Sequence, residues 1–295
     1  MTADLPGRDW PNRAASRTVR AAGLNWHVQV MGSGPVLLLA HGTGAATHSW
    51  RDLAPALARH FTVVAPDLPG HGYTEAPAAA RLSLPGMAKS LGALLVALNM
   101  QPVVAAGHSA GAAILARMAL DGLPSLRALV SLNGAFVPLQ GVPGQVFSPI
   151  ARLLVGLPGL PQLFAWRARD PGVVQKLLAA TGSTLDAEGV RLYAQAVRRP
   201  DHAASALAMM AHWDLRPLLA DLPRLRVPLL LVAGAGDRTV PPQQSAQVRD
   251  LVPGAALAML PGLGHLAHEE RAAEVAGLIT GFCRTHGVLP PACPS

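Results

Sequence analysis

A serine stands at the centre of residues 107–111, which read Gly-His-Ser-Ala-Gly. The apolar run 103–106 precedes this segment, and a helical pattern of small and apolar residues covers 112–120. A serine between two such glycines is typical of a sharp strand-to-helix turn that lifts its hydroxyl above the edge of a sheet. The pattern therefore predicts that Ser109 is a nucleophile, and an ordinary tight turn is the plainer alternative.

A serine hydroxyl is a poor nucleophile at neutral pH, so it needs a base for its proton and an acid that orients the base. Two residues that could fill these roles each come just after an apolar run. Asp237 follows 228–233, and His265 follows 256–260. The chain order serine, acid, histidine is the one found with this type of serine turn. We predict that Ser109 attacks, His265 accepts the proton and Asp237 orients the imidazole.

Three other residues compete for the roles of base and acid. His268 lies at the start of the last predicted helix, which favours a surface or capping histidine. Asp67 opens a turn that continues Leu-Pro-Gly-His-Gly, and turn-building is the simpler interpretation there. Asn133 follows another apolar run, but an amide cannot act as an anionic orienter. Asp237 therefore remains the favoured acid.

The negative oxygen formed by serine attack needs two N–H donors. The residue after the nucleophile, Ala110, supplies one, and the loop after the first buried strand supplies the other. That loop reads His-Gly-Thr-Gly from His41, so we assign the second donor to Thr43, with Gly44 as the alternative. Both His41 and His108 stand beside motif glycines and are expected to pack and form hydrogen bonds rather than act as bases.

Apolar runs alternate with amphipathic segments along most of the chain, which predicts an α/β fold with a mostly parallel central sheet and helices on both faces. A hairpin is expected first, at 17–21 and 25–30. The predicted buried strands are 36–40, 61–65, 103–106, 126–132, 228–233 and 256–260. The predicted helices are 50–59, 84–98, 112–120, 243–251 and 269–284.

The alternation stops between about 138 and 212, where helical patterns appear without a convincing buried strand. These patterns cover 149–155, 172–178, 187–197 and 203–213. An all-helical insertion between two strands is expected to cap the strand ends at which such sheets bind ligands. We therefore predict one domain, with a core at 17–137 and 213–287 and a helical cap at about 138–212.

Composition narrows the classes of function. The net charge of +7 comes mostly from scattered arginines, so a nucleic-acid partner is not expected. Neither a secretory signal nor a transmembrane segment is expected, and Cys283 and Cys293 are interpreted as free thiols of a cytoplasmic protein. The sequence has no cysteine and histidine cluster with metal-ligand spacing and no phosphate-binding loop, so we expect no metal and no cofactor.

These motifs, in this order, resemble the α/β-hydrolase superfamily over almost the whole chain. A narrower resemblance rests on 9–17 (Asp-Trp-Pro-Asn-Arg-Ala-Ala-Ser-Arg), 42–53 (Gly-Thr-Gly-Ala-Ala-Thr-His-Ser-Trp-Arg-Asp-Leu) and 107–113. These segments look like the hydrolase-fold accessory proteins of magnesium chelatase in bacteriochlorophyll biosynthesis. The resemblance implies a role at or near the insertion of magnesium into protoporphyrin IX, with chelatase subunits as partners, but it does not imply a reaction.

Three functions stay open at this point. The first is a serine hydrolase that cleaves an ester-type bond in a hydrophobic substrate. The second is a non-catalytic accessory that holds a tetrapyrrole for magnesium chelatase. The third is a generic carboxylesterase, or an enzyme with cofactor-free haloperoxidase-like or C–C bond chemistry. The complete set of nucleophile, base and acid favours the first, and the resemblance to an accessory protein favours the second.

The predicted cap carries a net charge of +3 among apolar side chains. In the simpler interpretation its apolar face packs on the body while the arginines are solvated. In the other, the cap lines a pocket for a flat macrocycle, and Arg167 or Arg169 pairs with the propionates of a porphyrin.

Overall fold

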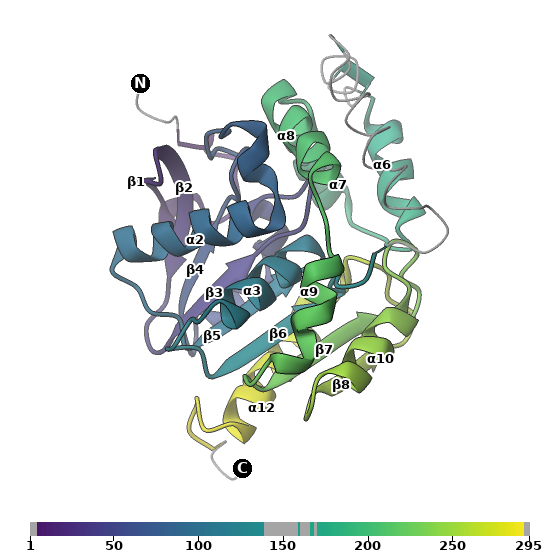
Figure 1. Cartoon of the computed structure of the whole chain (residues 1–295). Coiled ribbons are helices and arrows are strands. Elements are labelled where there is room, and N and C mark those ends of the chain that lie inside the picture. Colours follow the sequence, from purple (N-terminus) through teal and green to yellow (C-terminus); the bar gives the residue numbers. More distant parts are fainter. Residues whose placement is uncertain (1–4, 139–158, 160–165, 168–169, 292–295) are drawn as a thin grey trace.

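The computed structural model describes residues 5–138, 159, 166–167 and 170–291 (Figure 1). Within them lies an eight-stranded sheet with the strand order β1-β2-β4-β3-β5-β6-β7-β8. The strands are β1 Ser16–Ala21, β2 Leu24–Met31, β3 Val36–Ala40, β4 Thr62–Pro66, β5 Val104–His108, β6 Ala128–Leu132, β7 Leu229–Gly234 and β8 Ala256–Leu260. The pairs β1–β2 and β2–β4 are antiparallel and all the other pairs are parallel. The predicted sheet is confirmed, and each predicted buried strand overlaps an observed one.

The opening hairpin is made by a two-residue turn at Ala22 and Gly23, whose φ angles are 52° and 78°. Turns with two positive φ angles match the right-handed twist of the flanking strands, which explains the close pairing of β1 with β2. The hairpin extends the parallel part of the sheet through the antiparallel contact of β2 with β4.

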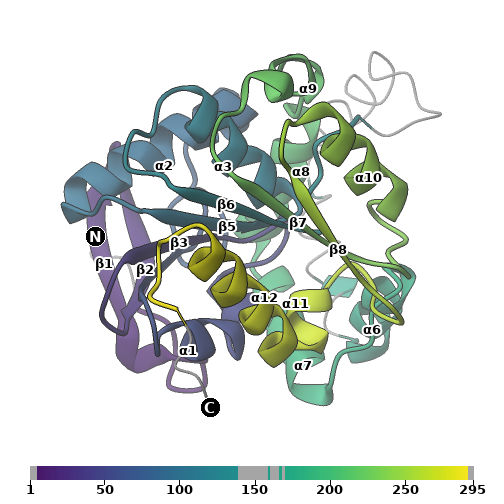
Figure 2. The same ribbon diagram turned by 90° about the horizontal axis from the view of Figure 1, so that it is seen from below.

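Helices cover both faces of the sheet (Figure 2). One face carries α2 Leu84–Leu98, α3 Ala110–Leu120, α9 Arg216–Asp221 and α10 Pro242–Leu251, and the other carries α1 Leu53–Leu57, α11 Ala267–Glu270 and α12 Ala272–Thr285. Short 3-10 turns lie at η1 Arg13–Ala15, η2 Thr47–Trp50, η3 Ala79–Leu82 and η4 Leu222–Arg224.

The sequence predicted one helix over 50–59, but the structure forms η2 and then the five-residue α1. Pro55 gives the physical reason. A proline has no backbone N–H and is tolerated only in the first turn of a helix, so α1 begins at Leu53.

The core consists of two layers because consecutive residues of a strand point to opposite faces of the sheet. In β3, Leu38 and Ala40 pack with the helices α2 and α3, whereas Leu37 and Leu39 pack with α1 and α12. All four side chains are fully buried. This double burial explains why the strands read as unbroken apolar runs, and it makes the positions of their carboxyl ends rigid.

Between β6 and β7 the described residues form the helices α6 Pro171–Ala180, α7 Ala187–Val197 and α8 Pro200–Ala211, which we call the cap helices. Each begins at a recognisable signal, since Asp170 and Asp186 cap α6 and α7 and a proline opens both α6 and α8. Figure 1 shows them together on one side of the sheet, beyond its upper edge. The helix predicted at 149–155 lies outside the described residues, and the division into core and cap stays a prediction.

In the described part of the chain, no helix is long and apolar enough to cross a membrane. Cys283 is a free thiol within α12, and burial raises its pKa to about 12. Such a thiol is not reactive at neutral pH. Cys293 lies outside the described residues.

Candidate active site

Ser109 occupies the single residue between β5 and α3, with φ 51° and ψ −118°. A non-glycine residue in this region is strained by about 1–3 kcal/mol and persists only where its surroundings enforce it. The two motif glycines explain the tight turn. A Cβ at Gly107 would clash with the backbone of Ala112, and one at Gly111 would clash with the carbonyl of Ala40. The sharp serine turn predicted from the sequence is therefore present.

Asp237 and His265 form a buried hydrogen-bonded pair, in which His265 Nδ1 lies 2.8 Å from Asp237 Oδ2. The N–H groups of Thr239 and Val240 donate to the other carboxylate oxygen, at 2.8 and 2.9 Å. Because Asp237 accepts at Nδ1, the imidazole carries its proton there and leaves Nε2 as an acceptor. Asp237 follows β7 and His265 follows β8, so both come from the same edge of the sheet as Ser109.

Asn133 takes part in this pair although sequence reasoning set it aside. Its Nδ2 donates to Asp237 Oδ2 at 2.8 Å and to the carbonyl of Gly264 at 3.3 Å. The residue has a φ of 49°, a conformation that asparagine tolerates better than most residues. Asn133 is thus a hydrogen-bond partner of Asp237. Its place after β6, the strand beside β7, is the signal that could have identified it.

The loop after β3 lies against Ser109. A Cβ on Gly42 would lie 3.1 Å from Ser109 Cβ and 2.8 Å from His108 Nδ1. Thr43, the next residue, is half-buried. Ala110 is the first residue of α3, so its N–H has no acceptor within the helix. The loop that carries Thr43 and the first turn of α3 therefore both adjoin Ser109.

The two motif histidines serve in packing and hydrogen bonding, as expected. The Nδ1 of His41 donates to the carbonyl of Gly42 at 2.8 Å, and its Nε2 accepts from the N–H of Leu68 at 2.9 Å. The Nε2 of His108 donates to the carbonyl of His265 at 3.0 Å. Burial lowers the pKa of both His41 and His108, so each is neutral at pH 7.

Ser109 and His265 come from adjoining parts of this edge. The ring of His108, the residue before Ser109, lies 4.7 Å from the ring of His265. Among the described side chains, no hydrogen bond joins Ser109 to His265. Such bonds are often long in free enzymes and shorten when substrate binds, so the gap does not remove either residue from the site.

The turn between α6 and α7 contacts the loops of both Asp237 and His265. The carbonyl of Thr181 accepts from the N–H of Arg238 at 3.1 Å and from the N–H of His265 at 3.4 Å. Ser183 Oγ accepts from the N–H of Leu266 at 2.8 Å. The turn between these two cap helices therefore helps to hold Asp237 and His265 in place.

His268 was predicted to be a surface or capping residue, and this prediction is wrong. It is 1% exposed, and its Nε2 lies 2.9 Å from Ser49 Oγ. Ser49 in turn donates to Glu269 Oε1 at 2.6 Å, and the hydroxyl of Tyr193 from α7 donates to the same oxygen at 2.7 Å. Burial lowers the pKa of His268 to about 3 and raises the pKa of Glu269 to about 7. The ring of His268, in the short helix α11, packs against Trp50. The position of a residue at a helix start gives no sign of such a long-range contact.

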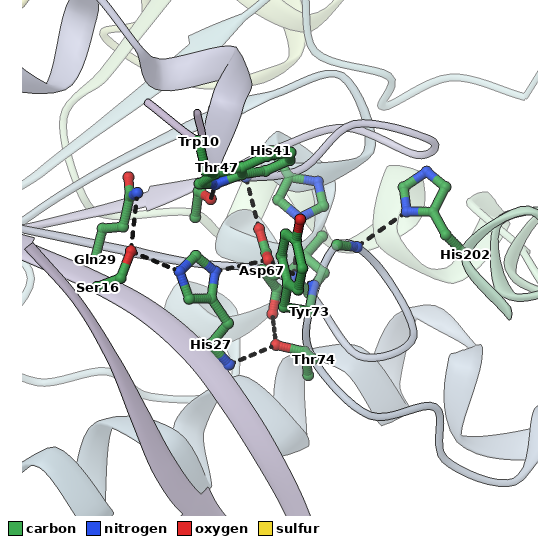
Figure 3. A network of polar contacts seen from close by, with 12 residues as sticks. Trp10, Ser16, His27, Gln29, His41, Thr47, Asp67, Tyr73, Thr74 and His202 are labelled. Carbon is green, nitrogen blue, oxygen red and sulfur yellow. Dashed lines mark hydrogen bonds and ion pairs between the residues drawn. The ribbon is translucent and has the colours of Figure 1, made fainter. Parts of the chain in front are cut away.

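Asp67 stabilises the turn that it opens, as the simpler interpretation of the sequence predicted (Figure 3). Its carboxylate accepts from the N–H groups of Thr47 at 2.6 Å and Tyr73 at 2.9 Å, and pairs with His27 Nδ1 at 2.7 Å. Burial alone would raise the pKa of Asp67, but the charge and hydrogen bond of His27 and the backbone donor lower it. His27 Nε2 lies 2.9 Å from Ser16 Oγ, so the network ties the opening hairpin to this turn.

No group of three or more metal-ligating side chains is found in the part of the chain that the structure describes. The polar side chains gathered at this edge are instead a serine, a histidine, a carboxylate and an amide. That set can carry out nucleophilic acyl transfer without a metal.

The family model for the alpha/beta hydrolase fold matches residues 35–272. The "Magnesium-chelatase 30 kDa subunit" of Rhodobacter capsulatus is 41% identical over 92% of this chain and 95% of its own. A 2-hydroxymuconate semialdehyde hydrolase of Pseudomonas sp. (strain CF600) is 29% identical over 90% of this chain and 93% of its own.

Solved structures agree on the architecture. An alpha/beta hydrolase fold protein from Burkholderia ambifaria has a TM-score of 0.76 at 23% identity and covers 90% of this chain and 97% of its own. An epoxide hydrolase has a TM-score of 0.77 at 22% identity and covers 92% of this chain and 98% of its own. At these identities the likeness concerns the fold alone. The chain belongs to the α/β-hydrolase family and is homologous to the 30 kDa subunit of magnesium chelatase.

Proposed function

We propose that this protein is a serine hydrolase associated with magnesium chelatase in bacteriochlorophyll biosynthesis, which cleaves an ester-type bond in a hydrophobic substrate. The observation that carries the proposal is the 2.8 Å bond between Asp237 and His265 at the sheet edge that also holds the strained Ser109. A buried carboxylate that fixes the proton on Nδ1 leaves Nε2 able to accept from a serine hydroxyl.

In the proposed reaction Ser109 Oγ attacks the substrate carbonyl while its proton passes to His265 Nε2. The resulting imidazolium is stabilised by Asp237 and then protonates the leaving group. The N–H groups of Ala110 and Thr43, with Gly44 as the alternative, donate to the negative oxygen. A water molecule, deprotonated by His265, then hydrolyses the acyl-serine. Such a base contributes about 10²–10⁴-fold to the rate, and one oxyanion donor contributes about 10²–10³-fold.

The link to magnesium chelatase rests on the Rhodobacter capsulatus relative, whose name makes it a subunit of that enzyme. Identity of 41% over nearly the whole of both chains supports a shared partner. We therefore propose magnesium chelatase subunits as partners and a hydrophobic small molecule, such as a tetrapyrrole, as the ligand.

A fluorophosphonate probe tests the nucleophile, since an activated serine displaces its fluoride and becomes phosphonylated. Ser109→Ala should abolish labelling, and His265→Ala should slow it by at least about 10²-fold. The matched control is Ser16→Ala, because Ser16 also has a histidine and a carboxylate in line, His27 and Asp67. Labelling that persists in Ser109→Ala, or disappears in Ser16→Ala, would refute the assignment.

A second function, a non-catalytic tetrapyrrole-binding accessory, is supported by the name of the same relative, which states membership of a complex rather than a hydrolytic reaction. Titration with protoporphyrin IX and its magnesium complex separates the two. Tight binding that Ser109→Ala leaves unchanged, together with no labelling of the native protein, would favour the accessory role.

A further inference from the structure

His202, on the cap helix α8, bridges two loops of the body. It is 2% exposed, its Nδ1 accepts from the N–H of Gly72 at 2.9 Å, and its Nε2 lies 3.1 Å from the carbonyl oxygen of Gly44. Figure 3 shows the ring reaching from its helix to the first of these loops. A backbone N–H can only donate and a carbonyl can only accept, so His202 must be neutral with its proton on Nε2. The burial that lowers its pKa to about 4 agrees with this state.

The carbonyl that His202 holds belongs to the peptide that joins Gly44 to Ala45. In a trans peptide the C=O and the N–H point to opposite sides, so fixing one fixes the other. The N–H of Ala45 donates to the carbonyl of Gly42 at 3.2 Å, and His41 Nδ1 donates to that same oxygen. The bond from His202 thus orients the peptide between Gly44 and Ala45. The N–H of that peptide in turn helps to orient a second peptide, whose carbonyl belongs to Gly42.

The second peptide joins Gly42 to Thr43. With its carbonyl held by Ala45 and His41, its N–H is directed to the opposite side. That N–H belongs to Thr43, the donor that we assign to the oxyanion. His202 of the cap therefore influences, through two peptide groups, the direction in which the N–H of Thr43 points.

The peptide that follows Gly44 needs such a restraint because packing around Gly44 does not fix it. Gly44 has a φ of 77°, and a Cβ added to it would meet nothing within 4 Å. A glycine in open space rotates its adjoining peptides at small steric cost, so packing does not determine their direction. Hydrogen bonds must do so instead.

One face of the helix α8 lies against the loop after β3 and against the turn that Asp67 opens. His202, Ser205 and Met209 are spaced by three and four residues and share that face. Gly70 packs against Ser205, and Thr43 Oγ1 lies 3.5 Å from Met209 Sδ. The same helix face therefore contacts Thr43 directly and also reaches it through the peptides that His202 holds.

We propose that His202 is a positioning residue that makes the oxyanion hole depend on the docked cap. When α8 is in place, the Nε2–H bond to Gly44 directs the N–H of Thr43 toward the reacting oxygen, and when α8 leaves, the loop loses that direction. The proposal rests on the hydrolase function proposed above, within which it assigns a role to a residue whose hydrogen bonds go to Gly72 and Gly44.

Two substitutions separate this role from simple docking of the cap. The side-chain amide in His202→Asn reaches only as far as Nδ1, so it can accept from Gly72 but cannot reach Gly44. The amide in His202→Gln reaches the position of Nε2 and can donate to Gly44. If His202 positions the oxyanion donor, catalytic activity should fall in His202→Asn and be retained in His202→Gln. If His202 only docks the cap, His202→Asn should be at least as active as His202→Gln.

The measurements are kcat and KM for p-nitrophenyl butyrate, with thermal unfolding as the check on folding. His202→Asn should lower kcat by about 10–100-fold, part of the effect of a whole oxyanion donor, with KM changed less than about threefold. His202→Gln should stay within about fivefold of the native kcat. Equal kcat in the two variants, or a change in KM alone, would overturn the proposal, as would failure of both variants to fold.

Hydrogen exchange gives a readout that does not need activity. In His202→Asn the backbone amides of residues 42–46 should exchange about tenfold faster, the change expected for one lost hydrogen bond, while those of α8 keep their protection. If the native protein hydrolyses no ester and is not labelled, the hydrolase function fails, but faster exchange confined to 42–46 still supports the coupling. Unchanged exchange there would overturn the coupling, whatever the activity.

Discussion

In Asp237→Asn, the new side-chain amide has only one orientation that satisfies its surroundings. The N–H groups of Thr239 and Val240 both donate to Oδ1, so the amide oxygen must take that position. The NH₂ group then replaces Oδ2 and faces His265 Nδ1 and Asn133 Nδ2. An NH₂ group donates and does not accept, so His265 must accept at Nδ1 and carry its proton on Nε2.

An imidazole with its proton on Nε2 cannot accept the proton of Ser109. We expect the acylation rate to fall on the order of 10⁴-fold, as for the same change in a serine protease, which corresponds to about 5 kcal/mol of activation free energy. The fold should survive because, among the residues that the structure describes, Asn133 Oδ1 has no hydrogen-bond partner. Rotation of that amide by half a turn presents this oxygen to the new NH₂ group.

The assay is the second-order rate of fluorophosphonate labelling, together with p-nitrophenyl butyrate hydrolysis, on protein whose folding is checked by thermal unfolding. Asn133→Ala is the matched control, because it removes one donor to Asp237 and leaves the bond to His265 intact. We expect this control to lose no more than about tenfold. Asp237→Asn that reacts within tenfold of the native rate would refute the tautomer argument. Asp67 could not take over, since it is bonded to His27.

Three further predictions concern the cap and its contacts. Burial raises the pKa of Glu269 to about 7, so the folded protein binds a proton that the unfolded chain releases above about pH 4.5, and stability should fall as pH rises from 4.5 through 7. Glu269→Gln should remove this slope, worth up to roughly 3 kcal/mol, in urea unfolding at pH 5 and pH 8. Tyr193→Phe deletes a 2.7 Å bond to Glu269 and should cost about 1–3 kcal/mol in the same experiment, whereas no loss would show that the bond does not anchor α7. Arg167, an exposed residue of the cap segment, tests the propionate clamp: Arg167→Ala should weaken protoporphyrin IX binding about tenfold and leave its dimethyl ester unaffected, and equal effects on both ligands would exclude the clamp.

The sequence predicted the sheet, and the positions of the three candidate catalytic residues at one edge of it, because both depend on short, local patterns. Strands buried on two faces are unbroken apolar runs, and their carboxyl ends meet at one edge when the strands are parallel. Ser109, Asp237 and His265 each follow such a run, so their placement at that edge needed no knowledge of side-chain contacts. The glycines beside Ser109 added the turn geometry.

The partners of these residues could not be predicted, because they are joined across long distances in the chain. Asn133 bonds to a residue 104 positions away, and His202 bonds to one 158 positions away. Whether a histidine or glutamate at a helix start is exposed depends on what packs over it, and this is why His268 was misjudged and Glu269 was missed. The direction in which the cap helices cross the body is likewise decided by tertiary packing, which no periodicity in their sequences encodes.

The distribution of constrained polar groups favours a catalytic role over a binding role. A tetrapyrrole carrier needs an apolar cavity and a few polar anchors, and it gains nothing from a strained serine or from a buried carboxylate that accepts four hydrogen bonds. In this protein the cap helices also contact the loops that carry the candidate catalytic residues. The turn between α6 and α7 bonds to the loops that hold Asp237 and His265, and α8 bonds to the loop that holds Thr43. A cap that only covered a ligand would need no bonds to these loops, whereas the observed bonds couple the position of the cap helices to the arrangement of Asp237, His265 and the loop of Thr43.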